Sequence, residues 1–490
     1  MWQMSLVRWV LRCRQLDAVC FSLQGNKAIL RQISSEGQFD DVLSDTEQNK
    51  YLREICSIPD CGHQVFVIQP QVKTGPNRVS HLKAELKLDE NCALVETLPR
   101  WNVVNKAVVP LKTPVASQIF PPGAFTRLTQ LITSRPDISA VLLGVDRLKS
   151  DEFLKLQQAW AVPVFDRYTI VLQIFKDHAK SKEAKLQVAL AEIPYIRSRL
   201  SQIEMGSYDQ QTGGVQFAGG TGDTFITVRR QLIQERESKL KRILRDLKNQ
   251  RGLLRRNRQR KQIPSVAVVG YTNAGKTTVI KALTGDSGLT PRNQLFATLD
   301  VTAHAGFLPN RMMAVFIDTV GFISDIPLDL INAFSATLED AVLADVIVHV
   351  RDISHPDSAA QCDDVIRTLK TMLSPTQMAN IIEVCNKADL LTCNHANNFH
   401  NDSFLVSATS GQGLSDLRNE IQDVLIQSTG QLEKTFRIPM DGEHLSWLYK
   451  EATVKSAEPD SDSEHLLVSV VISTAAYARF KSQFSTNREK

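Results

Sequence analysis

The chain has few cysteines for its length and no long apolar run. Eight cysteines are spread over 490 residues, which excludes the dense disulfide framework of small secreted domains and favours a reducing compartment. Cys56, Cys61 and His63 lie close together, but no second pair follows at the spacing of a zinc site, so we interpret them as unliganded. No stretch reaches the roughly eighteen apolar residues that a membrane-spanning helix needs, so we expect no membrane partner.

Acidic residues are scarce at the N-terminus, although the whole chain is nearly balanced at a net charge of +4. Residues 1–28 carry four basic residues and one acid, with large apolar residues between them. This pattern is typical of an organellar transit peptide; the family resemblance given below makes the expected location the mitochondrial matrix. The segment is also poor in serine, and the alternative is the start of a cytoplasmic protein.

Acids are scarce again between residues 229 and 261. This segment contains fourteen lysines and arginines but only three acids. Such a run is either a solvated helix face or a surface that neutralises nucleic-acid phosphates. The candidate RNA contacts are Arg229, Arg230, Arg242, Arg245, Arg255 and Arg256.

The length of 490 residues exceeds what one hydrophobic core supports and predicts several domains. We expect an α/β protein in which a nucleotide-binding domain follows a small α/β domain with a long helical hairpin and precedes a second small α/β domain. The expected segments are a transit peptide at 1–28, a disordered lead-in at 29–63, an α/β domain at 64–182, the basic hairpin at 183–261, the nucleotide-binding domain at 262–429 and the C-terminal domain at 430–490.

Apolar patterning predicts the elements of the first two domains. Short apolar runs at 65–68, 93–96, 140–143 and 162–165 are interpreted as strands, alternating with helical stretches. Apolar residues then recur at helical spacing on both sides of a glycine-rich segment, residues 206–224. Two long helices with this segment at their tip are expected to form the hairpin.

The sequence GYTNAGKT at residues 270–277 follows an apolar run and precedes a helix-compatible run. This context is typical of a phosphate-binding loop, in which glycines let the main chain approach the phosphates. Lys276 is expected to reach the β and γ phosphates, and the Thr277 hydroxyl to ligate Mg²⁺. The predicted nucleotide contacts here are Gly270, Tyr271, Thr272, Asn273, Ala274, Gly275, Lys276, Thr277 and Thr278.

Three further motifs follow in order: DTVG at residues 318–321, NKAD at residues 386–389, and Ser407 with Ala408. Each lies at the end of an apolar run. The carboxylate in NKAD, Asp389, can accept hydrogen bonds from two guanine donors that adenine lacks, which favours a GTPase over a P-loop ATPase or kinase. Because the ends of parallel strands meet at one edge of a sheet, we expect all four motifs to converge. The additional contacts are Asp318, Thr319, Val320, Gly321, Asn386, Lys387, Asp389, Ser407 and Ala408.

DTVGF, NKAD and the basic hairpin together resemble the HflX family of ribosome-associated GTPases, and its mitochondrial branch in particular. The resemblance covers roughly residues 110–485, and residues 185–200 are similar to the family's helical signature. FATLD, beginning at Phe296, is similar to its first switch and adds Phe296, Ala297 and Thr298 to the nucleotide contacts. The resemblance implies binding to the large ribosomal subunit and its rRNA by a monomer.

The implied activity is GTP hydrolysis that splits and recycles mitochondrial ribosomes. The alternative is a GTP-gated assembly factor for the large subunit without splitting activity. A third possibility, an RNA-modifying enzyme, is disfavoured because the first domain has no group of cysteine, metal-binding or cofactor-binding residues that would support it. The resemblance assigns catalysis to Lys276, Thr298 and Gly321, and Mg²⁺ to Thr277, Thr298 and, through water, Asp318. Asn273 is a candidate for holding K⁺, with a loop-stabilising asparagine as its alternative.

Three positions depart from familiar patterns. Phe322 follows the DTVG motif where many GTPases carry a glutamine that orients water, which predicts slow intrinsic hydrolysis and stimulation by a partner. Residues 219–223 and 120–123 differ from the bacterial glycine motifs of the family. These two differences favour an organellar target and leave the contacts of the hairpin tip open.

Overall fold

A computed structural model gives the structure of the protein. The described residues are 62–73, 80–111, 119–210, 221–260, 263–291, 294–298, 301–324, 342–391, 403–440, 442–460 and 464–485. The chain separates into two compact units, one of residues 1–60 with 214–240 and one of residues 61–213 with 241–490. The predicted transit peptide and nearly all of the predicted lead-in lie outside the described residues.

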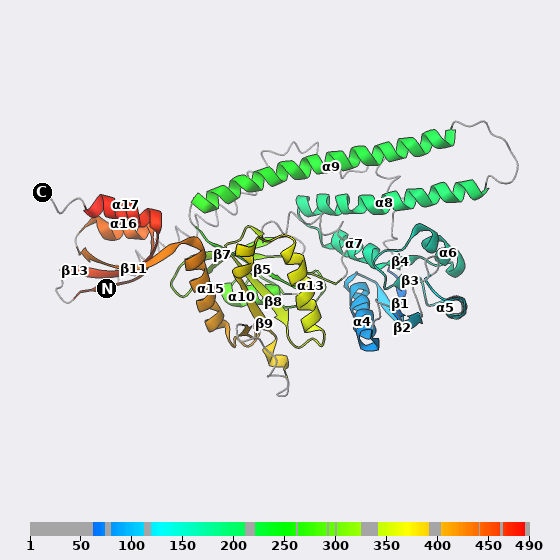
Figure 1. Cartoon of the computed structure of the whole chain (residues 1–490), viewed down its shortest axis with the longest axis horizontal. Helices are drawn as coiled ribbons and strands as arrows, with labels where there is room; N and C mark the ends of the chain where they lie inside the picture. Colours follow the sequence, from blue (N-terminus) through cyan, green and yellow to red (C-terminus); the bar gives the residue numbers. More distant parts are fainter. Residues whose placement is uncertain are drawn as a thin grey trace. The chain divides into compact units, whose positions relative to one another are not determined.

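A parallel four-stranded sheet begins the described part of the chain (Figure 1). The strands are β1 (Gln64–Val72), β2 (Asn102–Leu111), β3 (Ala140–Leu143) and β4 (Val164–Asp166), in the order β2-β1-β3-β4. The helices are α4 (His81–Thr97), α5 (Pro122–Ser134), α6 (Ser150–Trp160) and α7 (Arg167–His178). One core joins apolar residues of α5 and α6, such as Leu128 and Trp160, to Phe66 and Val141 of the sheet.

The prediction of a strand at residues 93–96 is wrong, because these residues lie inside helix α4. A short apolar run does not distinguish a strand from a buried helix turn. The buried residues of α4 include Leu88, Asn91, Leu94 and Val95, whose spacing is helical. The strand that the sequence pattern missed is β2, whose partly exposed residues follow no clear alternation.

Two long helices follow, α8 (Lys182–Gln210) and α9 (Thr221–Arg260). Pro194 lies inside α8. Near the end of α9, the Arg251 guanidinium forms an ion pair with Glu183 at the start of α8. Residues 211–220 of the predicted glycine tip lie outside the described residues, and residues 221–240 form the first half of α9.

The nucleotide-binding domain contains a six-stranded sheet of order β10-β9-β8-β5-β7-β6. All neighbouring strands are parallel except β6, which runs antiparallel to β7. The strands are β5 (Ser265–Gly270), β6 (Thr302–Phe307), β7 (Met313–Asp318), β8 (Val346–Asp352), β9 (Ile381–Asn386) and β10 (Phe404–Leu405).

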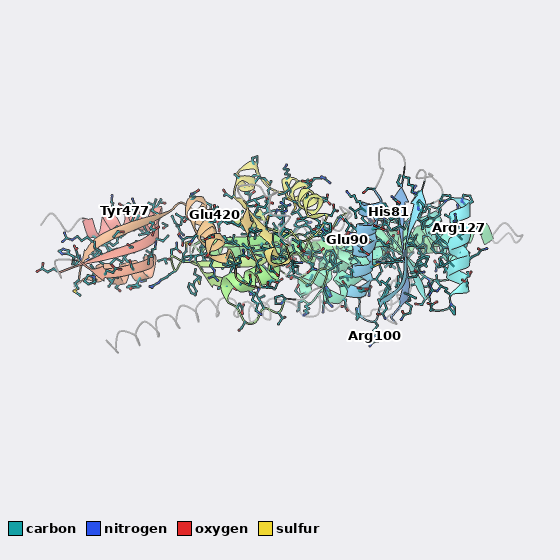
Figure 2. All side chains as sticks on the ribbon, turned by 90° about the horizontal axis from the view of Figure 1, so that it is seen from below. His81, Glu90, Arg100, Arg127, Glu420 and Tyr477 are labelled. Atoms are coloured by element: carbon teal, nitrogen blue, oxygen red, sulfur yellow. The ribbon has the colours of Figure 1, made fainter. Side chains whose placement is uncertain are left out.

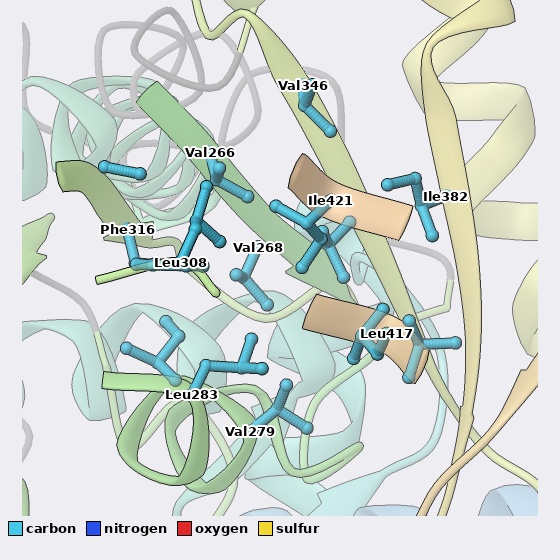
Figure 3. Close-up of a cluster of buried hydrophobic side chains, with 14 of the residues drawn as sticks. Val266, Val268, Val279, Leu283, Leu308, Phe316, Val346, Ile382, Leu417 and Ile421 are labelled. Atoms are coloured by element: carbon cyan, nitrogen blue, oxygen red, sulfur yellow. The ribbon is translucent and has the colours of Figure 1, made fainter. Parts of the chain in front are cut away.

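Helices pack on this sheet through an apolar core (Figure 3). The helices in this core are α10 (Lys276–Thr284) and α15 (Leu414–Thr429). The domain also contains α13 (Ser358–Lys370), α14 (Pro375–Ala379) and the short 3₁₀ helix η1 (Ala388–Leu390). Val279 of α10 and Leu417 of α15 are fully buried with Val268 of the central strand. This packing fixes the start of α10, where the phosphate-binding loop ends.

The C-terminal residues form a three-stranded antiparallel sheet of order β11-β13-β12 with helices on one face (Figure 1). Its elements are β11 (Gln431–Pro439), α16 (Glu443–Glu451), β12 (Thr453–Pro459), β13 (His465–Ser473) and α17 (Thr474–Ser485). Leu448 of α16 and Phe480 of α17 pack on β13 in a separate core. Across the described residues, no helix has the length and apolarity required to cross a membrane.

Candidate nucleotide-binding site

The loop at residues 270–277 connects β5 to α10, as its sequence predicts. Gly275 caps α10 with a φ of 92°, a left-handed conformation that favours glycine. A Cβ atom at Gly275 would lie 2.3 Å from the Asn386 side-chain nitrogen, so only glycine allows this approach. Asn273 has a φ of 60°, a region that asparagine tolerates better than most residues. The N-terminus of α10 thus faces a loop whose main chain is accessible to an anion.

Lys276 is buried at the first position of α10. Its Nζ atom donates hydrogen bonds to the carbonyl oxygens of Tyr271, at 2.9 Å, and Gly270, at 3.2 Å. Burial lowers the pKa of Lys276 to about 8, and the nearby carboxylate of Asp318 opposes this shift. The ammonium group is therefore held by the loop beside the position that a phosphate would take.

Three oxygen-bearing side chains converge next to this lysine. The Thr277 hydroxyl donates to Oδ2 of Asp318 at 2.6 Å, and the Thr298 hydroxyl lies 3.2 Å from the same atom. The two threonine oxygens are 3.2 Å apart. Oδ1 of Asp318 is buried and has no hydrogen-bond partner. Hydroxyl and carboxylate oxygens of this kind fit Mg²⁺, a hard cation that prefers oxygen ligands.

The segment after β7 lies against the phosphate-binding loop. The main-chain N–H of Phe322 donates to the Gly270 oxygen at 3.0 Å, and the Phe322 oxygen accepts from Thr272 at 2.6 Å. A Cβ atom at Gly321 would lie 2.9 Å from the Thr272 Cα atom, so any larger residue there would displace the phosphate-binding loop. The Phe322 side chain is buried, and a phenyl ring cannot orient a water molecule by hydrogen bonding.

The predicted base-reading residues follow β9 and β10. The side chain of Asn386 is buried, while Asp389 lies exposed on η1 and accepts from the Ser407 hydroxyl at 2.7 Å. Lys387 has a φ of 64°, and its ammonium pairs with Asp352 at 2.6 Å. Asp352, at the end of β8, was not predicted from the sequence, because a lone aspartate carries no motif.

A pocket brings the phosphate-side residues together. Pro291 and Gln294 line it as well, and their sequence offered no signal. Its lining residues are Thr272, Asn273, Gly275, Lys276, Thr277, Thr278, Pro291, Gln294, Phe296, Ala297, Thr298 and Gly321. The base-reading residues form a second group at the ends of the neighbouring strands.

The motif order and the parallel sheet with ligand-facing strand ends define a P-loop GTPase. A family model described as "50S ribosome-binding GTPase" matches residues 265–387. A second, described as "GTP-binding GTPase Middle Region", matches residues 178–258.

Whole-chain relatives give the same result. "Putative GTP-binding protein 6" of Xenopus laevis is 44% identical over 446 residues, covering 91% of this chain and 84% of the relative. The human protein of the same name is 42% identical over 455 residues, covering 92% and 87%. "GTPase HflX" of Caldanaerobacter subterraneus is 34% identical over 339 residues, covering 69% and 76%. The chain belongs to the HflX family and is a GTP hydrolase.

Proposed function

We propose that this GTPase binds the large subunit of the mitochondrial ribosome as a monomer and uses GTP binding to split ribosomes for recycling. The observation that carries the proposal is the basic surface of α9 in the same chain as the GTPase domain. Arg230, Arg242 and Arg245 are exposed on α9, and Lys or Arg residues on such a helix neutralise RNA phosphates. The description "50S ribosome-binding GTPase" of the matching family model supports the same partner.

In the proposed cycle, the phosphate-binding loop and Lys276 bind the β and γ phosphates. Thr277, Thr298 and, through water, Asp318 would hold Mg²⁺, and the ion would supply positive charge to the phosphoryl group being transferred. The main-chain N–H of Gly321 contacts the γ-phosphate, and Asp389 selects guanine. Lys276, Thr298 and Gly321 are the proposed catalytic residues.

The buried Phe322 side chain supports slow hydrolysis in the absence of a partner. A ribosomal subunit that orders the switch segments would supply the missing orientation of water. GTP thus favours a ribosome-engaged state, and hydrolysis permits release. A transit peptide at residues 1–28 would bring the protein to the mitochondrial matrix.

The test is sedimentation of purified mitochondrial ribosomes with the full chain and GTP, GDP or a non-hydrolysable GTP analogue. We expect monosomes to dissociate with the analogue, and the protein to sediment with the large subunit. Binding only to immature large subunits would identify an assembly factor instead. Equal turnover of GTP with and without the subunit would contradict stimulation by the ribosome.

A charge-reversed variant, Arg242→Glu with Arg245→Glu, tests the basic surface. We expect weaker subunit binding and a shallower salt dependence. In a plot of the logarithm of the binding constant against the logarithm of the salt concentration, each phosphate contact contributes about 0.7 to 0.9 to the magnitude of the slope. The matched control is Arg367→Glu with Lys370→Glu, an exposed pair at the same spacing on α13. Equal loss in both variants would mean that net charge, and not α9, drives binding.

A further inference from the structure

Helix α7 is a well-anchored element between β4 and the first hairpin helix. Oδ1 of Asp166 caps it by accepting from the Thr169 main chain at 2.8 Å and from its hydroxyl at 2.5 Å. Eight of the twelve helical residues are buried. Tyr168 also donates its hydroxyl proton to the Ala191 oxygen of α8 at 2.7 Å. Helix α7 is thus packed into the domain and hydrogen-bonded to α8.

The first residue of α7, Arg167, holds the segment that follows the DTVG motif. Its buried guanidinium donates to the Ser324 oxygen at 3.1 Å and to Asn91 at 2.8 Å. It also pairs with Glu90 at 3.1 Å. Glu90, on α4 (Figure 2), accepts the Ser324 hydroxyl proton at 3.1 Å. Ser324 is three residues beyond Gly321, the proposed γ-phosphate contact.

Glu90 connects this cluster to the phosphate-binding loop. Its Oε1 atom accepts the Tyr271 hydroxyl proton at 2.5 Å. The same Tyr271 hydroxyl oxygen accepts from the Ser324 main-chain N–H at 2.7 Å. Arg167 therefore fixes a carboxylate that contacts both the loop and the described segment that follows the DTVG motif, residues 322–324, here called the second switch. An arginine suits this position because its planar fork carries five donors.

The last residue of α7, His178, holds the first switch. Its Nδ1 atom donates to the Phe296 oxygen at 2.9 Å, since a carbonyl can only accept. The Phe296 side chain is buried and lies edge-on to Phe175 of α7, with ring centroids 4.7 Å apart. Phe296 is two residues before Thr298, so this anchor keeps the Thr298 hydroxyl near the proposed metal site.

Both switches are thus attached to one helix, at positions about 17 Å apart along its axis. We propose that Arg167 and His178 are positioning residues for GTP hydrolysis, and that α7 conveys the state of both switches to α8. Neither residue lines the nucleotide pocket, so each acts through the segment it holds. Because α8 begins at Lys182, a shift of α7 reaches the hairpin through three intervening residues. Only this last step rests on the proposed function.

The test measures turnover and nucleotide affinity separately in the full chain. His178→Phe keeps a ring but removes the donor, and Arg167→Lys keeps the charge but removes the fork. We expect kcat for GTP to fall about tenfold in each variant, about 1.4 kcal/mol in activation free energy, while the Kd for GDP stays within about twofold. His178→Asn, which restores a donor near the Nδ1 position, is expected to recover most of the rate. Lys155→Gln, an exposed change on α6 of the same domain, is the matched control.

Unchanged kcat in both variants would overturn the proposal, and so would a parallel loss of GDP affinity and thermal stability, which marks a purely structural role. Hydrogen exchange of α7 and α8, compared between GDP and a non-hydrolysable GTP analogue, tests the transmission. We expect a nucleotide-dependent difference in the wild type that a double variant, Arg167→Lys with His178→Phe, loses. No difference in the wild type would contradict transmission. None of these measurements uses ribosomes, so their failure is distinguishable from failure of the proposed function.

Discussion

The side-chain nitrogen of Asn386 donates a hydrogen bond to the main-chain oxygen of Ala274 at 2.9 Å. The side-chain oxygen of Asn386 accepts from the Ala408 N–H at 3.2 Å. One buried amide therefore connects the phosphate-binding loop to both base-reading segments. Because all three segments share this residue, the predicted phosphate-binding and base-binding segments are held at a fixed separation.

Asp389→Asn is expected to change the base preference from guanine to xanthine. The carboxylate can accept two hydrogen bonds from the N–H groups of guanine. The NH₂ group of an asparagine would instead face one of these N–H donors with a second donor. Losing such charge-assisted bonds costs about 2 to 4 kcal/mol, or about 30- to 1,000-fold in GTP affinity. Competition binding with GTP and xanthosine triphosphate measures the change, with the exposed Asp416→Asn in α15 as control. Unchanged GTP affinity would reject the assignment.

Thr298→Ala is expected to lower single-turnover GTP hydrolysis by about ten- to a hundredfold, the range for losing a group that stabilises transition-state charge. GDP affinity should stay within about twofold, because the first switch responds to the γ-phosphate. Thr298→Ser keeps the hydroxyl and serves as the matched control. A variant that loses GDP affinity and turnover together would place Thr298 in general folding rather than in metal binding.

The rate of GTP hydrolysis is expected to be higher in potassium than in sodium if Asn273 helps to hold a monovalent cation. Asn273→Gly removes the side chain while accommodating the φ of 60°. In this variant the two salts should give equal rates, measured at the same ionic strength. Equal rates in the wild type would leave Asn273 with the structural role of stabilising the loop.

His349 on β8 is expected to make the stability of the GTPase domain depend on pH. Burial lowers its pKa to about 4, outweighing the carboxylate of Glu383, while Arg351 and Lys276 lower it further. Between pH 6.5 and 4 the unfolded chain binds a proton that the folded chain does not, so the unfolding free energy falls as the pH falls. The loss is up to about 3 kcal/mol.

This difference is measured by calorimetry, with the GTPase-domain transition identified by its shift on adding GDP. His349→Met retains an apolar group of similar volume and cannot gain a proton. We expect the stability of the wild type relative to this variant to fall on acidification over that pH range. A constant difference between the two proteins would show that His349 does not take part.

The phosphate-binding loop could be predicted from the sequence because its requirements are local. Gly275 needs a left-handed conformation, and the apolar runs beside the loop specify a strand and a helix within a few residues. The strand expected at 93–96 failed because four apolar residues suit either a strand or a buried helix turn, and only packing of α4 on the sheet decides between them.

Only the tertiary structure decided how the switches are held. Arg167 meets Ser324 across 157 residues of sequence, and His178 meets Phe296 across 118. The sequence does not show whether an arginine is buried in such a cluster or exposed to solvent, because the partners of the buried arginine come from distant segments of the chain. The sequence therefore determined the nucleotide chemistry through short motifs, whereas the packing of the first α/β domain against the switch segments determined which helix holds them.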